Sequence, residues 1–499
     1  MKTALLLYPH QLFAVSDLPK DIDEVVLVEE PLLFGTDKKR KMYFHKQKLV
    51  FHRATMVRYM EEELWPAGYQ VDYIEFKRLD DSGDIVEKLK EFDKVHIFEL
   101  DDDTLGRRLK SALDAHPQAP EIEPMKSPNF FLDSDESAKF FSDTKNASFP
   151  KFYQWQRERF NILIDTETYK PLEGKFMCPP LKRQRLSKAA KLPSFQVYGS
   201  NQYIVEARKY VEQNFPDNPG TVSDFPWPTN RHEARVWLKE FLEGRLGKYA
   251  LYQEAVDSEA SWMYHSAISP TLNVGLLQAK EVIDAALEIG RKQDVPIESM
   301  ECFVRYILGW REFSRGEYKK RHVTLRATNS FGHNRHMTID WYKGTTGLQP
   351  VDDVIKKTLS RAYVHHIERH MVLGNIMFLC EFHPDEIFRW FMEMFIDSYD
   401  WITVPNVYGV SQGAAFDTLG TPPSISSSNF IMSMSHYKKG EWSDTWDGLY
   451  WRAIDKHRLK FEKTDELGRA VKQLDRMNKN RRRIIGYRAE DFLRQKTTL

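Results

Sequence analysis

The sequence predicts an α/β N-terminal domain with a parallel sheet, joined by a long connector to a large all-α domain. Three observations support this fold class: short apolar runs alternate with helix-length patterns near the N-terminus, proline-rich and basic sequence follows, and helical patterns fill the rest. We therefore expect three parts, at residues 1–130, 131–200 and 201–499. At roughly 150 residues per domain, a chain of 499 residues has room for about three.

The predicted sheet rests on four short runs of apolar and β-branched residues, at positions 3–8, 24–29, 70–75 and 94–99. Between the second and third runs, residues 45–64 carry apolar side chains at near-helical spacing. Alternation of short strands with longer helices is typical of a parallel sheet covered by helices. No GxGxxG follows the first strand, so the ordinary dinucleotide-binding motif is missing.

The connector is predicted from turn-forming and charged residues. Its prolines, from Pro128 to Pro180, interrupt regular structure, and we expect only some helix inside it. A basic run follows, comprising Lys182, Arg183, Arg185, Lys188 and Lys191. Such a run is as typical of a solvated surface as of a nucleic-acid contact.

The third part is predicted to be all-α because strand alternation is scarce and helical spacing recurs. The expected helices cover residues 202–214, 231–243, 276–290, 297–316, 350–374, 384–396 and 463–480.

Composition excludes several protein classes. The 72 Lys and Arg residues balance the 72 Asp and Glu residues, which argues against a histone-like polyanion binder. No apolar run approaches the roughly 20 residues that cross a bilayer, and the apolar N-terminal run is too short for a signal peptide. Cys178, Cys302 and Cys380 lack the close spacing of a disulfide scaffold or a CxxC zinc site. We expect a cytoplasmic protein with no membrane association and no obligate protein partner.

The densest chemical motif is HHIERH at residues 365–370, inside the helix predicted at 350–374. A spacing of four places His366 and His370 on one helix face, with Arg369 nearby. The order differs from the zinc motif HExxH, so we predict no metal site. Two imidazoles beside an arginine are typical of proton donors at an anion-holding site, although a histidine-rich helix surface is the alternative.

Two further motifs could serve a ligand. HSAISP at residues 265–270 offers hydroxyls and free backbone N–H groups to a phosphate, or is an ordinary helix cap. GWREF at residues 309–313 brings an indole and a guanidinium together, which suits a planar ring with an anionic tail as well as a packed core helix.

The motifs HSAISPTLNVGLL, GWREF, WYKGTTGLQPVD and HHIERH, in this order, resemble the flavin domain of the cryptochrome/photolyase family. FHKQKLVFHRATM (44–56), MKSPNFFLDS (125–134) and VPNVYGVSQ (404–412) resemble its prokaryotic (6-4) photolyase branch, which is related to the iron–sulfur bacterial cryptochromes. The resemblance covers nearly the whole chain. It implies a Rossmann-like N-terminal domain and a helical FAD-binding domain.

The resemblance implies a folded FAD in the helical domain. The residues that match the family's FAD site are Tyr249, His265, Ser266, Ala267, Ile268, Ser269, Trp310, Arg311, Arg369, Asp397 and Thr403. Tyr249 and residues 265–269 are expected to hold the phosphates and the ribityl chain. Arg369 is expected to face the flavin ring, Asp397 its pyrimidine edge and Thr403 its N5 position.

The implied activity is light-driven repair of (6-4) pyrimidine–pyrimidone photoproducts in UV-damaged DNA, by electron transfer from excited reduced FAD. His366 is the expected acid–base catalyst, with His370 as its helper and His365 in support. A nearby imidazolium can trap the radical anion of the lesion by proton transfer. The alternatives are a blue-light receptor of the cryptochrome type without repair, and a photolyase for cyclobutane pyrimidine dimers.

The resemblance also implies an aromatic electron relay to the flavin. Trp390 matches its proximal member, with Phe391 and Tyr342 or Trp341 further out, and phenylalanine is a poor hopping station. Contacts to the DNA backbone are expected from the connector residues Lys182, Arg183 and Arg185.

The sequence departs from the branch at two cofactor sites. The cluster cysteines are replaced by Pro350, Lys438, Glu441 and Asp444, so we predict no iron–sulfur cluster. At the antenna site, His10 and Leu33 replace the carboxylates that bind lumazine, while Gln11 remains. We expect His10 and Gln11 to line the site of any lumazine- or deazaflavin-type antenna.

Overall fold

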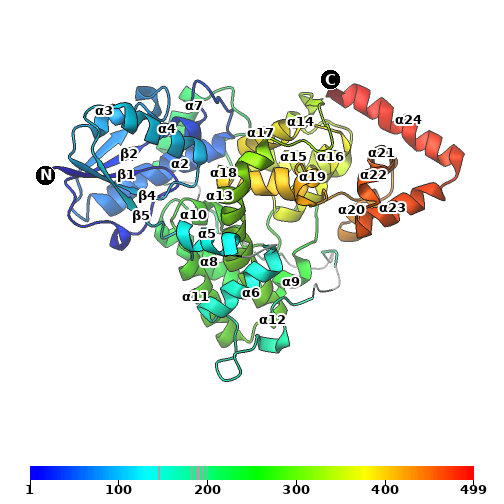
Figure 1. Ribbon diagram of the computed structural model, residues 1–499, viewed down its shortest axis with the longest axis horizontal. Helices are drawn as coiled ribbons and strands as arrows, with labels where there is room; N and C mark the ends of the chain where they lie inside the picture. Colours follow the sequence, from blue (N-terminus) through cyan, green and yellow to red (C-terminus); the bar gives the residue numbers. More distant parts are fainter. Residues whose placement is uncertain (144–146, 180, 182–183, 187–191, 194–195, 199–200) are drawn as a thin grey trace.

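In the computed structural model, which describes residues 1–143, 147–179, 181, 184–186, 192–193, 196–198 and 201–499, the chain opens with a five-stranded parallel sheet. The strands lie in the order β3-β2-β1-β4-β5 (Figure 1). Their bounds are β1 Thr3–Leu7, β2 Glu24–Val28, β3 Val71–Ile74, β4 Lys94–Phe98 and β5 Glu121–Met125. The first four strands confirm the four predicted runs.

Strand β5 was not predicted because it lacks an apolar signal. It is an edge strand of sequence EIEPM, and none of its residues is fully buried. Pro124 within it has no N–H to donate, which an edge strand tolerates. By contrast, β1 and β2 each bury four consecutive residues at the centre of the domain.

Helix α2 (Lys46–Tyr59) continues into the turn η2 (Met60–Leu64), so the helix predicted at residues 45–64 is confirmed. Helix α7 (Gln202–Asn214) has the predicted bounds and packs along α2. The chain between the sheet and α7 contains α5 (Ser134–Asp143) and α6 (Phe149–Phe160), the latter packed on the helical domain.

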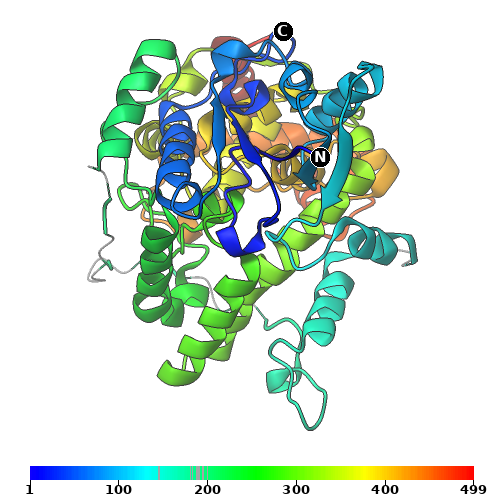
Figure 2. The ribbon, with the colours of Figure 1, turned by 90° about the vertical axis from the view of Figure 1, so that its left-hand side faces the viewer.

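The rest of the described chain is mostly helical, as predicted (Figures 1 and 2), apart from the short antiparallel pair β6 (His336–Met337) and β7 (Thr497–Thr498). The longer helices are α8 Arg231–Gly244, α11 Ala279–Gln293, α12 Ile297–Val304, α13 Glu312–Arg326, α15 Gln349–Arg361, α17 Pro384–Met394, α21 Glu441–Lys456, α23 Asp465–Asp475 and α24 Lys479–Lys496. The π-helical turn η6 (Arg305–Arg311) joins α12 to α13, so the helix predicted at 297–316 extends to residue 326. None of the helices in these ranges is long and apolar enough to cross a membrane.

The helix predicted at residues 350–374 is wrong as a single element. Helix α15 ends at Ala362, which has the left-handed φ of 52°. The chain runs extended to His365 before helix resumes and leads into η7 (Glu368–Gly374). Ile396 N–H donates to the Ala362 carbonyl at 2.9 Å and fixes the break. Likewise, the helix predicted at 463–480 ends at Asp475, and α24 begins after a turn.

Candidate functional site

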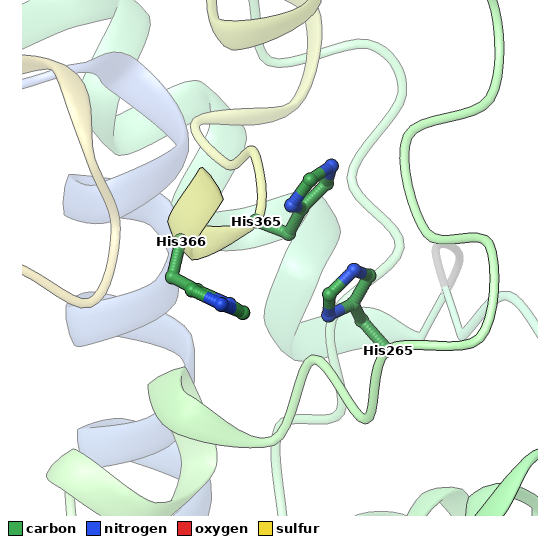
Figure 3. Close-up of side chains that lie close together, drawn as sticks. All are labelled: His265, His365 and His366. Carbon is green, nitrogen blue, oxygen red and sulfur yellow. The ribbon is translucent and has the colours of Figure 1, made fainter. Parts of the chain in front are cut away.

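The break after α15 positions the histidine segment, residues 365–370. His365 lies in the extended chain, and His366 starts the following helix. Both rings lie beside His265, from the loop before α10 (Ser269–Asn273) (Figure 3). The His265 and His365 rings stack with centroids 4.2 Å apart and an interplanar angle of 10°, and His366 meets His265 edge to face at 5.7 Å. Two segments 100 residues apart in sequence thus form one imidazole cluster: His265, His365 and His366.

The imidazole cluster is uncharged at neutral pH. Burial, followed by the neighbouring His370 and Arg369, lowers the pKa of His366 to about 3. Burial lowers the pKa of His370 to about 4 and holds the pKa values of His265 and His365 well below the ordinary range. The imidazolium expected at His366 therefore requires an anionic group that enters the site with a ligand.

Tyr306 is a site residue that the sequence analysis missed. Its hydroxyl, from η6, lies 3.1 Å from Nε2 of the half-buried His366. Burial raises the pKa of Tyr306 above its ordinary value, so the phenol keeps its proton and can donate a hydrogen bond to the imidazole. A neutral ring that accepts at Nε2 carries its own proton at Nδ1. No sequence signal could pair these residues, because the contact joins two helices 60 positions apart.

The imidazole cluster is poorly arranged for a metal ion, although its nitrogens lie within 4.8 Å of one another. The stacked rings of His265 and His365 lie in nearly parallel planes, so their lone pairs cannot converge on one ion unless a ring rotates. The absence of a metal site stays a prediction.

Arg369 and Asp397 form a two-pronged ion pair beside the imidazole cluster. The guanidinium donates from Nη1 to Oδ1 at 2.7 Å and from Nη2 to Oδ2 at 3.1 Å. The Ser269 hydroxyl adds a bond to Asp397 Oδ2 at 2.6 Å, and the Asn273 amide donates to the Asp397 carbonyl at 2.9 Å. The structure thus brings together Ser269 and Arg369, from two of the motifs, with the predicted site residue Asp397.

The segment 265–269 is held in an unusual backbone conformation. Ala267 has a φ of 50°, in the left-handed region that costs a non-glycine residue about 1 kcal/mol or more. The indole N–H of Trp237 donates to the Ser266 carbonyl at 2.8 Å, and Ile268 is buried. Tyr249 is buried with its ring edge-on to His265 at 5.9 Å. Tyr249 and residues 265–269, which were predicted to hold the phosphates and the ribityl chain, therefore lie next to one another.

Arg311 carries buried donors that have no protein acceptor. Its Nη1 donates to the Asn273 side-chain oxygen, whereas Nε and Nη2 have no hydrogen-bond partner in the part of the chain that the structure describes. The guanidinium packs against the rings of Phe130 and Trp401, 4.6 and 4.7 Å from their centroids, and the two rings also contact each other. Burial lowers the pKa of Arg311 to about 10. The Nε2 of His265 is likewise buried without a partner in the described ranges. Because unsatisfied buried donors are costly, these groups fit a polar, anionic ligand such as the FAD diphosphate.

Trp310 and Thr403, also predicted to line the FAD site, differ from Arg311 in their surroundings. The Trp310 indole N–H donates to the Asn406 side chain at 3.1 Å, and its ring packs on Phe149 of α6. Thr403 is buried in α18 (Asp400–Val404).

The motif at residues 44–56 forms a clamp on the site. From α2, the Gln47 amide donates to the Ser360 carbonyl at 2.6 Å, in the last turn of α15 before the histidine segment. The Lys48 ammonium donates to the Ser398 carbonyl at 2.6 Å, next to Asp397. Burial lowers the pKa of Lys48 to about 7, although the charge of Asp397 opposes this. We name this contact the α2 clamp: Gln47 and Lys48 fasten the two segments that carry the histidines and Asp397.

The proposed relay residues follow one another outward from Arg369. The Arg369 guanidinium lies 4.1 Å from the Phe395 ring centroid, and Phe395 packs edge-on to Trp390 at 5.7 Å. The indole N–H of the buried Trp390 donates to the Trp341 carbonyl at 3.0 Å. Phe391 touches Trp390 at 5.6 Å between centroids, and Tyr342 follows Trp341 directly.

His10 and Gln11 lie at the carboxyl edge of the sheet, directly after β1. Both ring nitrogens of His10 and the Tyr8 hydroxyl are buried without a hydrogen-bond partner among the described residues. Burial lowers the pKa of His10 to about 4 and raises the pKa of Glu30, after β2, to about 7. The amide of Gln11 contacts the Phe98 carbonyl at 3.5 Å. This edge therefore has buried polar groups that are free to hydrogen-bond a ligand.

The positions of the missing cluster cysteines hold ordinary structural contacts. Asp444 pairs with Arg488 at 2.8 Å, and the Lys438 carbonyl accepts the indole N–H of Trp442 at 3.0 Å. The three cysteines are buried as free thiols at other positions. The absence of an iron–sulfur cluster stays a prediction.

A second cluster of ligand-type side chains, missed from the sequence, comprises His333, Glu381 and His457. Nε2 of His333 lies 3.3 Å from Nε2 of His457, and all three residues are buried.

Arg452 and Lys456 donate to Glu381 at 2.6 and 2.7 Å. Burial raises the pKa of Glu381, but the bond from Lys456 and the charge of Arg452 outweigh it and lower the pKa to about 2. Three cations, the third being Arg335, already balance this carboxylate, so the second cluster disfavours a divalent ion.

The expected DNA contacts are only partly described. Lys182 and Arg183 lie outside the described residues. Arg185 is exposed, with its Nε 3.4 Å from the Ser433 carbonyl.

Sequence comparisons relate the chain to photolyases. The family model "Deoxyribodipyrimidine photo-lyase-related protein" matches residues 5–227. The (6-4) photolyase of Agrobacterium fabrum (strain C58) is 29% identical over 472 residues, covering 90% of this chain and 91% of that protein.

Structural comparisons show the same fold. The cryptochrome of Synechocystis has a TM-score of 0.55 at 14% identity, covering 82% of each chain. The archaeal photolyase of Sulfolobus tokodaii, solved with two FAD molecules, has a TM-score of 0.53 at 14% identity, covering 84% of each chain. The sheet domain and the helical domain have the fold of photolyases and cryptochromes, and residues 5–227 match the photolyase-related family. The chain is similar to the (6-4) photolyase of Agrobacterium fabrum along nearly its whole length.

Proposed function

We propose that this chain binds FAD and uses blue light to repair (6-4) pyrimidine–pyrimidone photoproducts in UV-damaged DNA. The observation that carries the proposal is the imidazole cluster beside the Arg369–Asp397 ion pair, with His366 half-buried and hydrogen-bonded to Tyr306. The long match to a (6-4) photolyase supports the same activity.

Bound FAD would supply the light-driven electron. The chain's own part is to hold it: the free donors of Arg311 and His265 suit its phosphates and hydroxyls, and Arg369 with Asp397 presents donors and an acceptor to its ring edge. Ser269 and Asn273 fix the Asp397 carboxylate, so this edge is organised before the ligand arrives.

The proton chemistry is assigned to His366. Tyr306 donates to Nε2, so the neutral imidazole presents its Nδ1–H as the proton that it can give. A radical anion in the lesion is the kind of charge that would raise the low pKa of His366 and draw this proton. His370 and His365 support His366 through the same helix and the same cluster.

DNA would be held by phosphate contacts. Lys182, Arg183 and Arg185 of the connector are the proposed contacts, and the flipped lesion would enter beside His366. Charge removal at Arg185 should weaken DNA binding at low salt and leave flavin absorbance unchanged.

The carboxyl edge of the sheet is proposed as the antenna site. The unpartnered His10 nitrogens and Tyr8 hydroxyl support a lumazine- or deazaflavin-type ring there. Extraction of pigment from the purified protein, with His10→Phe as the comparison, tests this assignment.

The decisive test is blue-light repair of three oligonucleotides, which contain a (6-4) photoproduct, a cyclobutane dimer or no lesion. Repair of the (6-4) substrate alone is the expected result. Repair of the dimer alone identifies a cyclobutane photolyase. Flavin binding without any repair favours a cryptochrome-type receptor, a function that a neutral His366 would suit.

A further inference from the structure

Glu393 of α17 is a buried carboxylate to which the proposed function gives no role. Its side chain is only 3% exposed. Oε1 accepts from Arg389 Nε at 2.9 Å and from the Tyr43 backbone N–H at 3.0 Å. Oε2 accepts a bond from the Tyr342 hydroxyl at 3.3 Å. Two donors therefore fix Oε1, and Oε2 is the oxygen left for the phenol.

Tyr342 lies at the outer end of the relay. It belongs to α14 (Asp340–Lys343) and is partly exposed. The Trp390 indole N–H bonds to the Trp341 carbonyl, which belongs to the peptide unit that joins Trp341 to Tyr342. One hydrogen bond and one peptide unit thus connect Tyr342 to the innermost tryptophan.

The neighbours of Trp390 differ in what happens when they lose an electron. Phe391 is too hard to oxidise, and the Trp341 indole N–H donates to the Lys496 carbonyl at 2.8 Å, which cannot take up a proton. A phenol loses its electron readily only if its proton can leave at the same time. Burial, followed by the charge of Glu393, raises the pKa of Tyr342, so the phenol is protonated at rest.

We propose that Tyr342 and Glu393 form the terminal donor pair of the relay, Tyr342 supplying the electron and Glu393 accepting the proton. Trp390 would give one electron to a bound flavin in its oxidised, light-excited state. Tyr342 returns one electron to the Trp390 radical cation, and its phenolic proton moves to Oε2 of Glu393. The products are neutral Trp390, a neutral Tyr342 radical and a protonated Glu393, so charge and atoms balance. The inference rests on the proposed function, because a flavin is the light-driven oxidant.

Arg389 makes the proton transfer reversible. Its side chain is 46% exposed, so water can solvate the guanidinium while Glu393 is protonated. When an external reductant refills Tyr342, the Arg389 charge favours return of the proton from Glu393 to the phenolate oxygen.

The test is laser-flash spectroscopy of the full-length, flavin-loaded protein in H2O and D2O. In the wild type, the tryptophan radical should be replaced by a tyrosine radical, and this step should be at least about twofold slower in D2O. In Glu393→Gln the step should be about tenfold slower and should lose its isotope effect. Glu386→Gln, which removes the same charge from α17 without a bond to Tyr342, should behave as the wild type.

Tyr342→Phe leaves the other Glu393 contacts in place and should abolish the tyrosine radical while the tryptophan radical persists. A tyrosine radical that forms at the same rate and with the same isotope effect in Glu393→Gln overturns the inference. So does a wild type that forms the tryptophan radical but no tyrosine radical, and this result leaves the proposed function intact. Photoreduction that survives in Trp390→Phe instead refutes the expected relay through Trp390, and this inference falls with it, whereas the repair assay tests the proposed function separately.

Discussion

The helical domain contains two buried groups of ligand-type side chains that differ in how their polarity is satisfied. In the imidazole cluster, both nitrogens of His365 and Nε2 of His265 have no hydrogen-bond partner among the described residues. In the second cluster, the two histidines face each other at 3.3 Å and Glu381 holds two cations by hydrogen bonds. Both groups are rich in histidine, but only the first has free hydrogen-bonding capacity.

The difference separates a binding site from a structural one. Buried polar groups without partners cost stability, so a chain keeps them where a ligand completes them. The second cluster is complete within the protein and ties α21 to the loop at residues 329–333. Variants in the two clusters should therefore fail in different assays.

The largest expected effect is loss of repair in His366→Ala. The single-turnover rate of (6-4) repair should fall by at least about 100-fold, because the proton donor is removed, while FAD content is unchanged. The exposed His336→Ala serves as the control and should repair normally. Undiminished repair by His366→Ala would contradict the assignment of the imidazole cluster.

The next largest effect is on stability, in Glu381→Gln. Removing the carboxylate leaves Arg452, Lys456 and Arg335 without their shared partner, which should cost about 3 kcal/mol of unfolding free energy by urea denaturation. Repair by the protein that remains folded should be normal. Glu490→Gln, at the exposed end of Arg452, should change stability by less than about 0.5 kcal/mol.

The second cluster should also make stability fall on acidification. Burial, followed by neighbouring charges, lowers the pKa of His333 to about 3 and of His457 to about 4, from an ordinary value of 6.5. A histidine with a lowered folded pKa stabilises the folded state above pH 6.5, and this stability is lost as pH falls toward the folded value.

Each histidine adds up to about 1.4 kcal/mol per pH unit to this slope. Urea titrations at pH 7, 6 and 5 should show a smaller slope for His457→Gln and an unchanged slope for the exposed His232→Gln. Equal slopes in the wild type and His457→Gln would contradict the buried, neutral state of the pair.

The smallest expected effect tests the hydrogen bond between Tyr306 and His366 in the imidazole cluster. Tyr306→Phe removes one hydrogen bond to His366, worth about 1 kcal/mol, and should slow repair about fivefold. The pH–rate profile of repair should shift as well, because the phenol no longer fixes the protonated nitrogen of His366. A slower rate with an unshifted profile would indicate that Tyr306 acts only through packing.

Much of the fold could be predicted because hydrophobic patterns are local. The buried runs of β1 and β2 and the periodicity of α7 each identify an element without knowledge of its neighbours. Strand β5 was missed because an exposed edge strand needs no apolar residues. The single helix predicted through residue 362 was wrong because a left-handed alanine and the bond from Ile396 stop it, and neither is a local signal.

The candidate site likewise contains residues that the sequence could predict and residues that it could not. The HHIERH and HSAISP motifs drew attention to His365, His366 and His265, because these residue types are rare and chemically distinct. Tyr306 and Glu393 act through contacts with residues 60 and 51 positions away, which no sequence spacing shows. The backbone break that turns His365 toward His265 also depends on the tertiary fold.

The α2 clamp has a consequence for how the protein can be divided. Since Gln47 and Lys48 belong to the sheet domain, the helical domain expressed alone would lose the fastening of Ser360 and Ser398. The two halves are therefore expected to melt cooperatively, as one calorimetric unit. The sheet domain therefore braces the candidate site mechanically, a role that does not depend on its binding a pigment.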